Sequence, residues 1–143
     1  MTTVLAFGTF DLLHPGHEFF LSEARKLGDR LLVSMPADAD VMYLKRKPPG
    51  HTFSVRSAAV KETGLVDDIF ASDPPEAHGT FSLVERAAPD IIALGYDQQA
   101  LGTALEEWKT RYQKSVELVT LPAYQPERYK TSLLRKSSPY DRS

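Results

Sequence analysis

The chain has 143 residues, enough for one domain with a hydrophobic core, and its 42% hydrophobic and 25% charged residues are ordinary for a water-soluble globular protein. It contains no cysteine, which excludes disulfide bonds, thiolate zinc sites and a cysteine nucleophile. The net charge of −2 does not favour nucleic-acid binding, and no apolar segment has the length of a membrane helix or the pattern of a signal peptide. We therefore expect a cytoplasmic protein that binds neither nucleic acid nor a membrane.

The first part of the chain has the pattern of a βαβ unit. Residues 4–7 are an apolar run that predicts a buried strand, and residues 15–27 have apolar positions at helical spacing, with Gly28 placed to end the helix. Residues 30–35 are a second apolar run and predict another buried strand. This order predicts a parallel sheet with a right-handed crossover.

Helices and strands continue to alternate along the rest of the chain. The predicted elements are a short helix or turn (36–43), a basic loop with two prolines (44–50), a helix (54–63), an edge strand (66–71), a helix (81–88), a strand (90–94), a helix (101–112), a strand (116–121) and a short basic helix (131–136). In the helix at 54–63 we expect Val55, Ala58 and Ala59 to face the core. Five strands in this arrangement predict a single α/β domain over residues 1–136, with a Rossmann-like, doubly wound parallel sheet, followed by a disordered tail over residues 137–143.

The residues with unusual chemistry follow the predicted strands. The turn at 8–17 follows the first strand, the basic loop at 44–50 lies beyond the second, residues 95–98 follow the fourth and residues 130–132 lie beyond the fifth. Ligands of doubly wound sheets bind outside the carboxyl ends of the strands. The four segments therefore predict one ligand site on one rim of the sheet.

The turn at 8–17 predicts a phosphate site. Gly8 removes a side chain where the backbone must turn and where a ligand could approach. Pro15 suits the first position of a helix, which puts His14 at the N-cap and His17 three residues later. Free N–H groups and the dipole of a helix N-terminus favour phosphate, and two imidazoles there could act on it. The alternative is one capping histidine and one incidental exposed one; zinc would need a third ligand that the sequence does not indicate.

Positive charge is concentrated between residues 43 and 61. This stretch has no acidic residue and contains Lys45, Arg46, Lys47, Arg56 and Lys61. Such charges are often only a solvated surface, but the position on the predicted rim favours contact with phosphate. The sequence has no G-x-x-x-x-G-K-S/T, G-x-G-x-x-G or H-E-x-x-H pattern, which disfavours P-loop phosphoryl transfer, dinucleotide redox binding and this type of zinc site.

Residues 8–17, Gly-Thr-Phe-Asp-Leu-Leu-His-Pro-Gly-His, resemble the H-x-G-H signature of the cytidylyltransferase-like nucleotidyltransferases, and the resemblance extends along nearly the whole domain. Residues 89–98 and 121–132 are most similar to the archaeal-type FAD synthases, which are FMN adenylyltransferases. Glycerol-3-phosphate cytidylyltransferases share the first motif but usually differ at the second. The third motif of the family is a Ser/Thr-rich helix start; here Lys130 takes its first place, and Thr131 and Ser132 match.

The resemblance implies adenylyl transfer from ATP to FMN, giving FAD and pyrophosphate, by direct in-line attack on the α-phosphate. CTP with glycerol 3-phosphate is the alternative substrate pair, and nucleotide binding without catalysis is a third reading. Mg²⁺ or another divalent cation is implied because it neutralises triphosphate charge, with Asp11 as a candidate ligand. Analogy with the family also implies a homodimer.

The same resemblance assigns roles to individual residues. The residues expected to be catalytic are His14, His17, Lys47 and Arg56, and those expected to bind the acceptor phosphate are Lys45, Arg46 and Lys47. The residues expected to bind the nucleotide are Gly8, Thr9, Phe10, His14, Gly16, His17, Gly95, Tyr96, Asp97, Gln98, Tyr124, Lys130, Thr131 and Ser132. The candidates for stacking on a flavin ring are Tyr43, Phe53, Tyr124 and Tyr129.

Overall fold

The computed structural model describes residues 1–74 and 81–124, which form a five-stranded parallel sheet. The strand order is β3-β2-β1-β4-β5. The strands are β1 (Thr3–Phe7), β2 (Arg30–Met35), β3 (Asp68–Ala71), β4 (Ile91–Leu94) and β5 (Glu117–Thr120). The Rossmann-like prediction is confirmed, and the central place of β1 puts the turn at 8–17 beside the point where the strand order reverses.

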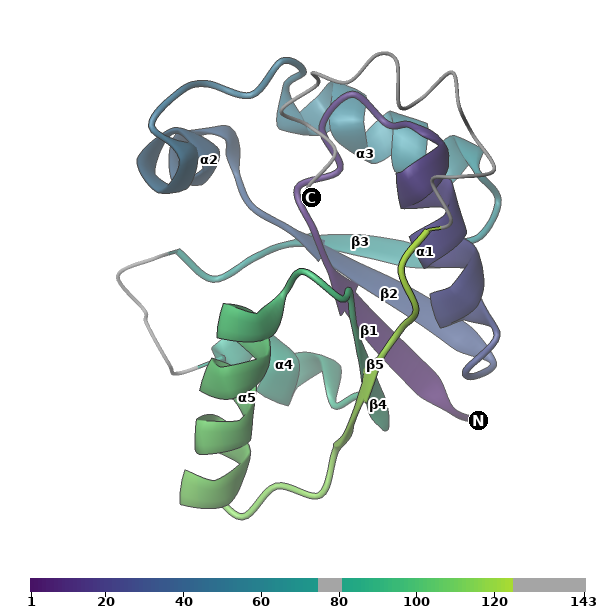
Figure 1. Ribbon diagram of the computed structural model, residues 1–143, viewed down its shortest axis with the longest axis vertical. Helices are drawn as coiled ribbons and strands as arrows, with labels where there is room; N and C mark the ends of the chain where they lie inside the picture. Colours follow the sequence, from purple (N-terminus) through teal and green to yellow (C-terminus); the bar gives the residue numbers. More distant parts are fainter. Residues whose placement is uncertain (75–80, 125–143) are drawn as a thin grey trace.

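Helices cover both faces of the sheet (Figure 1). They are α1 (Pro15–Arg25), α2 (Asp38–Lys45), α3 (Phe53–Glu62), α4 (Ser82–Ala87) and α5 (Gln99–Arg111). Alternate residues of β1 point to opposite faces, so Val4 and Ala6 pack with α1 and α3, whereas Leu5 packs with α4 and α5. In residues 1–74 and 81–124, no helix is long and apolar enough to span a membrane.

Three local predictions about the helices are wrong. Helix α1 ends at Arg25, before Gly28, so Gly28 does not cap it. Gly28 instead allows the close approach of the chain before β1, because a Cβ there would lie 2.7 Å from the carbonyl oxygen of Thr2. Helix α2 extends through Lys45 into the predicted basic loop, and Arg46 ends it with a φ of 63°. Helix α3 buries a different face from the predicted one, as described below.

Candidate active site

The turn after β1 is shaped by an aromatic ring that folds back over a glycine. Phe10 is fully buried with a φ of 51°, and a Cβ added to Gly8 would lie 2.6 Å from its ring. The Phe10 ring meets the His17 ring edge-on, with 5.4 Å between the ring centroids. Gly8 is therefore required for the close approach of the ring, and the ring in turn supports a histidine of the H-x-G-H motif.

The two histidines cap α1 and stack on each other. His14 Nδ1 accepts a hydrogen bond from Gly16 N at 3.1 Å, and His14 N donates to His17 Nδ1 at 3.2 Å. The two imidazole rings have their centroids 3.8 Å apart and an interplanar angle of 25°. Since each Nδ1 accepts a backbone N–H, each neutral ring carries its proton on Nε2.

His17 combines deep burial with an unsatisfied hydrogen-bonding atom. Its side chain is almost fully buried, and Nε2 has no hydrogen-bond partner among the described residues. Burial, aided by the neighbouring charges of His14 and Lys45, lowers the pKa of His17 to about 3. The imidazole is therefore neutral at physiological pH and presents an Nε2–H donor to a ligand that can accept it.

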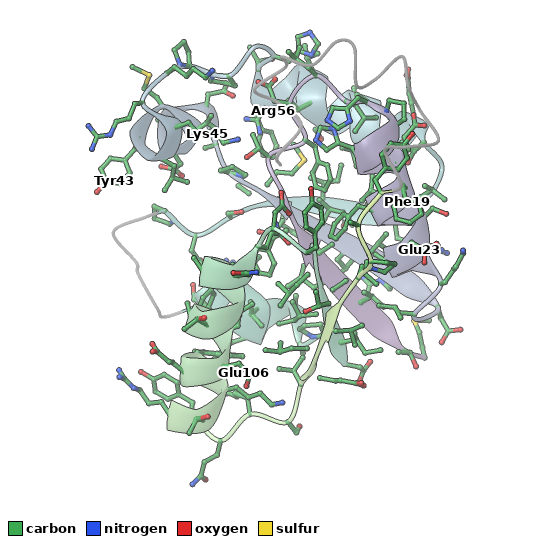
Figure 2. The ribbon with its side chains drawn as sticks, in the orientation of Figure 1. Phe19, Glu23, Tyr43, Lys45, Arg56 and Glu106 are labelled. Carbon is green, nitrogen blue, oxygen red and sulfur yellow. The ribbon has the colours of Figure 1, made fainter. Side chains whose placement is uncertain are left out.

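Lys45, the last residue of α2, lies close enough to His17 for its charge to affect the pKa of that histidine. Desolvation lowers the pKa of Lys45, while the charges of Asp11 and Asp97 oppose that effect. Its charge also acts on His17. Figure 2 shows Lys45 and Arg56 in the region between α2 and α3. The ammonium group thus lies within electrostatic reach of both the turn after β1 and the loop after β4.

Arg56 lies on the buried face of α3 and connects three loops. Its Nη1 donates to Thr9 O at 3.0 Å, Nε donates to His51 O at 3.1 Å, and Nη2 donates to Pro36 O at 3.0 Å and to Asp38 Oδ1 at 2.8 Å. The side chain has no exposed surface. This placement does not fit the predicted phosphate contact, because the guanidinium forms hydrogen bonds with protein oxygens and is buried away from the surface.

Asp11, in the turn after β1, also contacts the loop between α2 and α3. Its Oδ2 accepts from Gly50 N at 2.6 Å and its Oδ1 accepts from His51 N at 2.8 Å. Both carboxylate oxygens are engaged by backbone, which does not fit the predicted metal ligand. We call Asp11 and Arg56 the loop brace, because together they connect the turn after β1 to the loop between α2 and α3.

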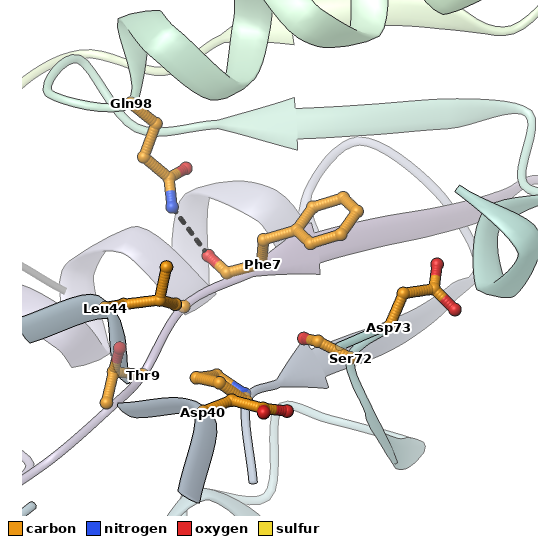
Figure 3. Close-up of a pocket in the computed structure, with 9 residues that line it drawn as sticks. Phe7, Thr9, Asp40, Leu44, Ser72, Asp73 and Gln98 are labelled. Atoms are coloured by element: carbon orange, nitrogen blue, oxygen red, sulfur yellow. Dashed lines mark hydrogen bonds between the residues drawn. The ribbon is translucent and has the colours of Figure 1, made fainter. Parts of the chain in front are cut away.

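Gln98 joins the ends of two neighbouring strands at the switch point. Its Nε2 donates to Phe7 O at 2.9 Å (Figure 3), and its Oε1 accepts from Gly95 N at 2.8 Å. The side chain amide is used within the protein, so the predicted direct contact of this group with the nucleotide is not supported. In contrast, Tyr96 and Asp97 of the same loop are exposed at the rim.

A pocket of about 210 Å³ opens beside the turn, beyond the ends of β1, β2 and β3. Its lining comprises Phe7, Gly8, Thr9, Pro36, Asp40, Leu44, Ser72, Asp73 and Gln98. Figure 3 shows Asp40 and Leu44 of α2 on one side and Ser72 and Asp73 on the other. Sequence reasoning missed these four residues, although the four-residue spacing of Asp40 and Leu44 is the signal of a shared helix face.

The segment after β5 reaches the tip of α1. The ring centroids of Tyr124 and Phe19 are 5.6 Å apart, and a Cβ on Gly16 would lie 3.8 Å from the Tyr124 ring. This brings the beginning of the predicted third motif to the H-x-G-H turn. Lys130, Thr131 and Ser132, together with Tyr129, the helix predicted at 131–136 and the tail at 137–143, lie outside the described residues.

The remaining predicted residues differ in their placement. Arg46 and Lys47 are exposed in the loop after α2, and Tyr43 is 69% exposed on α2. Phe53 is partly buried, with the guanidinium carbon of Arg56 5.5 Å from its ring centroid. Phe53 thus packs within the protein, which does not favour its predicted role in stacking on a flavin.

Comparison with known proteins agrees with this geometry. The model of the cytidylyltransferase-like family matches residues 5–137, and the chain belongs to that family. The FAD synthase of Thermococcus onnurineus (strain NA1) is 37% identical over 132 residues, which cover 90% of this chain and 85% of that protein. The FAD synthase of Aciduliprofundum boonei (strain DSM 19572 / T469) is 40% identical over 124 residues, 87% of this chain and 80% of that protein.

Solved structures show the same fold. The lipopolysaccharide core biosynthesis protein from Thermoplasma volcanium GSS1 has a TM-score of 0.76 and 32% sequence identity, over 87% of this chain and 99% of that chain. Pantoate-beta-alanine ligase from Francisella tularensis has a TM-score of 0.63 at 12% identity, over 87% of this chain and 60% of that chain, a likeness of fold alone. The predicted family and fold class are thus confirmed.

Proposed function

We propose that this protein is an ATP:FMN adenylyltransferase that makes FAD and pyrophosphate. The observation that carries nucleotidyl transfer is the buried, neutral His17 with its Nε2–H unsatisfied at the switch point of the sheet. The choice of ATP and FMN is supported by the FAD synthases to which the chain is similar over most of its length.

In this reaction a phosphate oxygen of FMN attacks the α-phosphorus of ATP. A new P–O bond forms while the bond to the pyrophosphate oxygen breaks, so no protein nucleophile is needed. Negative charge grows on the oxygens around the α-phosphorus, and His17 Nε2–H would donate a hydrogen bond there. A neutral donor held in a dry site stabilises that charge without reorganisation, and His14 would act from the adjacent stacked ring.

The other residues position the phosphates. The backbone N–H groups of Thr9 and Phe10 would hold phosphate oxygens, and the absence of a side chain at Gly16 would leave room for the ribose. Lys45, with Arg46 and Lys47 in the adjoining loop, would meet the acceptor phosphate or the leaving pyrophosphate. The loop brace would keep the turn after β1 and the basic loop after α2 at a constant separation. The phosphates bound to them would thus be held in position for the in-line attack, which adds to the stabilisation of charge by His17.

The base and ribose would lie on the β4–β5 side. Gly95, Tyr96 and Asp97 are candidates to contact them, with Gln98 holding the loop in place. Tyr124 is a candidate from the other side of the turn, and Lys130, Thr131 and Ser132 are retained as candidates for the triphosphate.

The described residues do not form a ready site for Mg²⁺. No group of three or more His, Asp or Glu side chains in residues 1–74 and 81–124 is arranged to hold a metal ion, and the Asp11 carboxylate is bound to backbone. We therefore assign Asp11 the role of positioning the loops that meet at the site. A homodimer and a cytoplasmic location remain predictions.

The test offers the purified protein ATP or CTP with FMN or glycerol 3-phosphate, and follows pyrophosphate and FAD. We expect turnover with ATP and FMN. Turnover with CTP and glycerol 3-phosphate alone would refute the proposal, and ATP binding without turnover on any pair would favour a non-catalytic nucleotide-binding protein.

A second measurement tests the role of His17. We expect His17→Ala to lower kcat by about 10²- to 10³-fold with little loss of ATP affinity, because the hydrogen bond strengthens in the transition state. His17→Gln retains an N–H donor and should lose less. An unchanged kcat in His17→Ala would show that the imidazole does not act on the reaction.

A further inference from the structure

We propose that the pocket beside the turn binds the uncharged part of the acceptor, its hydroxyl-bearing chain and flat ring, and that Asp40 accepts a hydrogen bond from it. This inference rests on the proposed function and extends it to the residues that select the acceptor. The pocket borders Gly8 and Thr9 of the phosphate turn, so a molecule seated there would have its other end at the α-phosphate.

The walls of the pocket exclude a phosphate and suit a neutral group. Phe7, Pro36 and Leu44 provide apolar surface, whereas Asp40 and Asp73 bring two carboxylates. None of the described residues lining it is Lys, Arg or His. An anion there would meet like charge in partly desolvated surroundings, whereas hydroxyl or ring N–H groups would find acceptors.

One of the two carboxylates is already engaged and the other is not. Asp73 Oδ1 accepts from Ser82 Oγ at 2.9 Å and Oδ2 accepts from Leu83 N at 3.2 Å, so Asp73 caps α4. The Asp40 carboxylate is half-buried and has no hydrogen-bond or ion-pair partner among the described residues. Asp40 lies in the first turn of α2, where its negative charge interacts favourably with the helix dipole. That interaction does not require the carboxylate to line a pocket.

Helix α2 presents residues to both ends of the proposed acceptor. Asp40 and Leu44 are four residues apart and line the pocket together, and Lys45 is the next residue, within electrostatic reach of His17. The phosphate of the acceptor would lie at Lys45 while its ring enters the pocket. A volume of about 210 Å³ is below the roughly 300–1,000 Å³ typical of a whole ligand site, so the pocket would enclose only part of the chain and ring, and the rest would lie along its rim.

The test measures FMN and ATP binding separately from turnover. Quenching of FMN fluorescence gives the Kd for FMN in the parent protein and in Asp40→Asn and Leu44→Ser, with Glu106→Gln on α5 as the matched control, far from α2 (Figure 2). We expect Asp40→Asn to raise the Kd for FMN about 10-fold, since a neutral amide oxygen replaces the charged acceptor and forms a weaker hydrogen bond. Leu44→Ser, at an exposed position, should raise it by a smaller factor, and the Kd for ATP should not change.

Riboflavin, which lacks the phosphate, provides an independent arm. It should compete with FMN and not with ATP, and Asp40→Asn should weaken it as much as FMN. An unchanged Kd for FMN in both variants, in a protein that makes FAD, would overturn the inference and leave the proposed function intact. Equal weakening of ATP and FMN would also overturn it, because it would show that the variants merely displace α2. A protein that makes no FAD would instead contradict the proposed function.

Discussion

Replacing Arg56 by methionine distinguishes a structural brace from a phosphate ligand. The change leaves the carbonyl oxygen of Thr9 without its donor in a buried place, which costs about 1–3 kcal/mol. The bonds to Pro36 O and His51 O contribute about 0.5–1.5 kcal/mol each. Asp38 is 45% exposed and can be rehydrated, so its share of the ion pair is small. We expect Arg56→Met to lower the free energy of unfolding by about 2–6 kcal/mol, the combined cost of the unpaired Thr9 oxygen and the two other lost bonds.

Urea unfolding followed by circular dichroism measures this loss, with Arg86→Met on the exposed surface of α4 as the control, for which a change within about 0.5 kcal/mol is expected. Arg56→Lys retains the charge but cannot bond to three loops at once, so its free energy of unfolding should lie between those of the parent protein and Arg56→Met. A phosphate ligand would give the opposite pattern, normal stability with a raised KM for ATP. A loss below about 1 kcal/mol in Arg56→Met would refute the brace.

Three other expectations follow from the site. The pKa of His17 is about 3 in the folded protein and near 6.5 in the unfolded chain, so the unfolded chain takes up the proton first as the pH falls. The free energy of unfolding should therefore decrease below about pH 6.5, by about 3 kcal/mol between pH 6.5 and 4. Urea unfolding of His17→Gln should not show this decrease. Asp11→Asn should lower kcat by roughly 10- to 100-fold through misplaced loops. Its half-saturating Mg²⁺ concentration should not change, and a large rise would restore Asp11 as a metal ligand. Gln98→Glu cannot donate to Phe7 O and should lose about 1–3 kcal/mol of stability, whereas exposed Gln99→Glu should lose none; equal stabilities would contradict the strand-joining role.

The sheet and the histidine turn could be predicted from the sequence because their signals are local. Four or five consecutive apolar residues specify a buried parallel strand, and a proline after His14 specifies where α1 begins. The stacked pair of His14 and His17 follows from positions three apart at a helix start. Local patterns of this kind act before any tertiary contact is made.

The roles of Arg56, Asp11 and Gln98 could not be read in the same way. Apolar residues alone suggested that Val55, Ala58 and Ala59 face the core, yet Val55 is 48% exposed and α3 buries Arg56. An arginine becomes a core residue only when backbone carbonyls from distant loops converge on it, and a single sequence does not show that convergence. The sequence pattern therefore assigns charged residues near a ligand site to the ligand, whereas in this structure Arg56 and Asp11 form hydrogen bonds with backbone atoms of distant loops.

The central position of β1 has a consequence for the order in which the chain assembles. Thr2 N reaches Asp29 across 27 residues, whereas Thr3 N reaches Asp90 across 87 residues. During synthesis β1 can pair with β2 early, but its other edge stays open until β4 emerges, and that edge contains the apolar residues Val4, Leu5 and Ala6. Non-local parallel pairing is slow, so the strand that supports the histidine turn keeps an unpaired edge, open to aggregation, while the chain is incomplete.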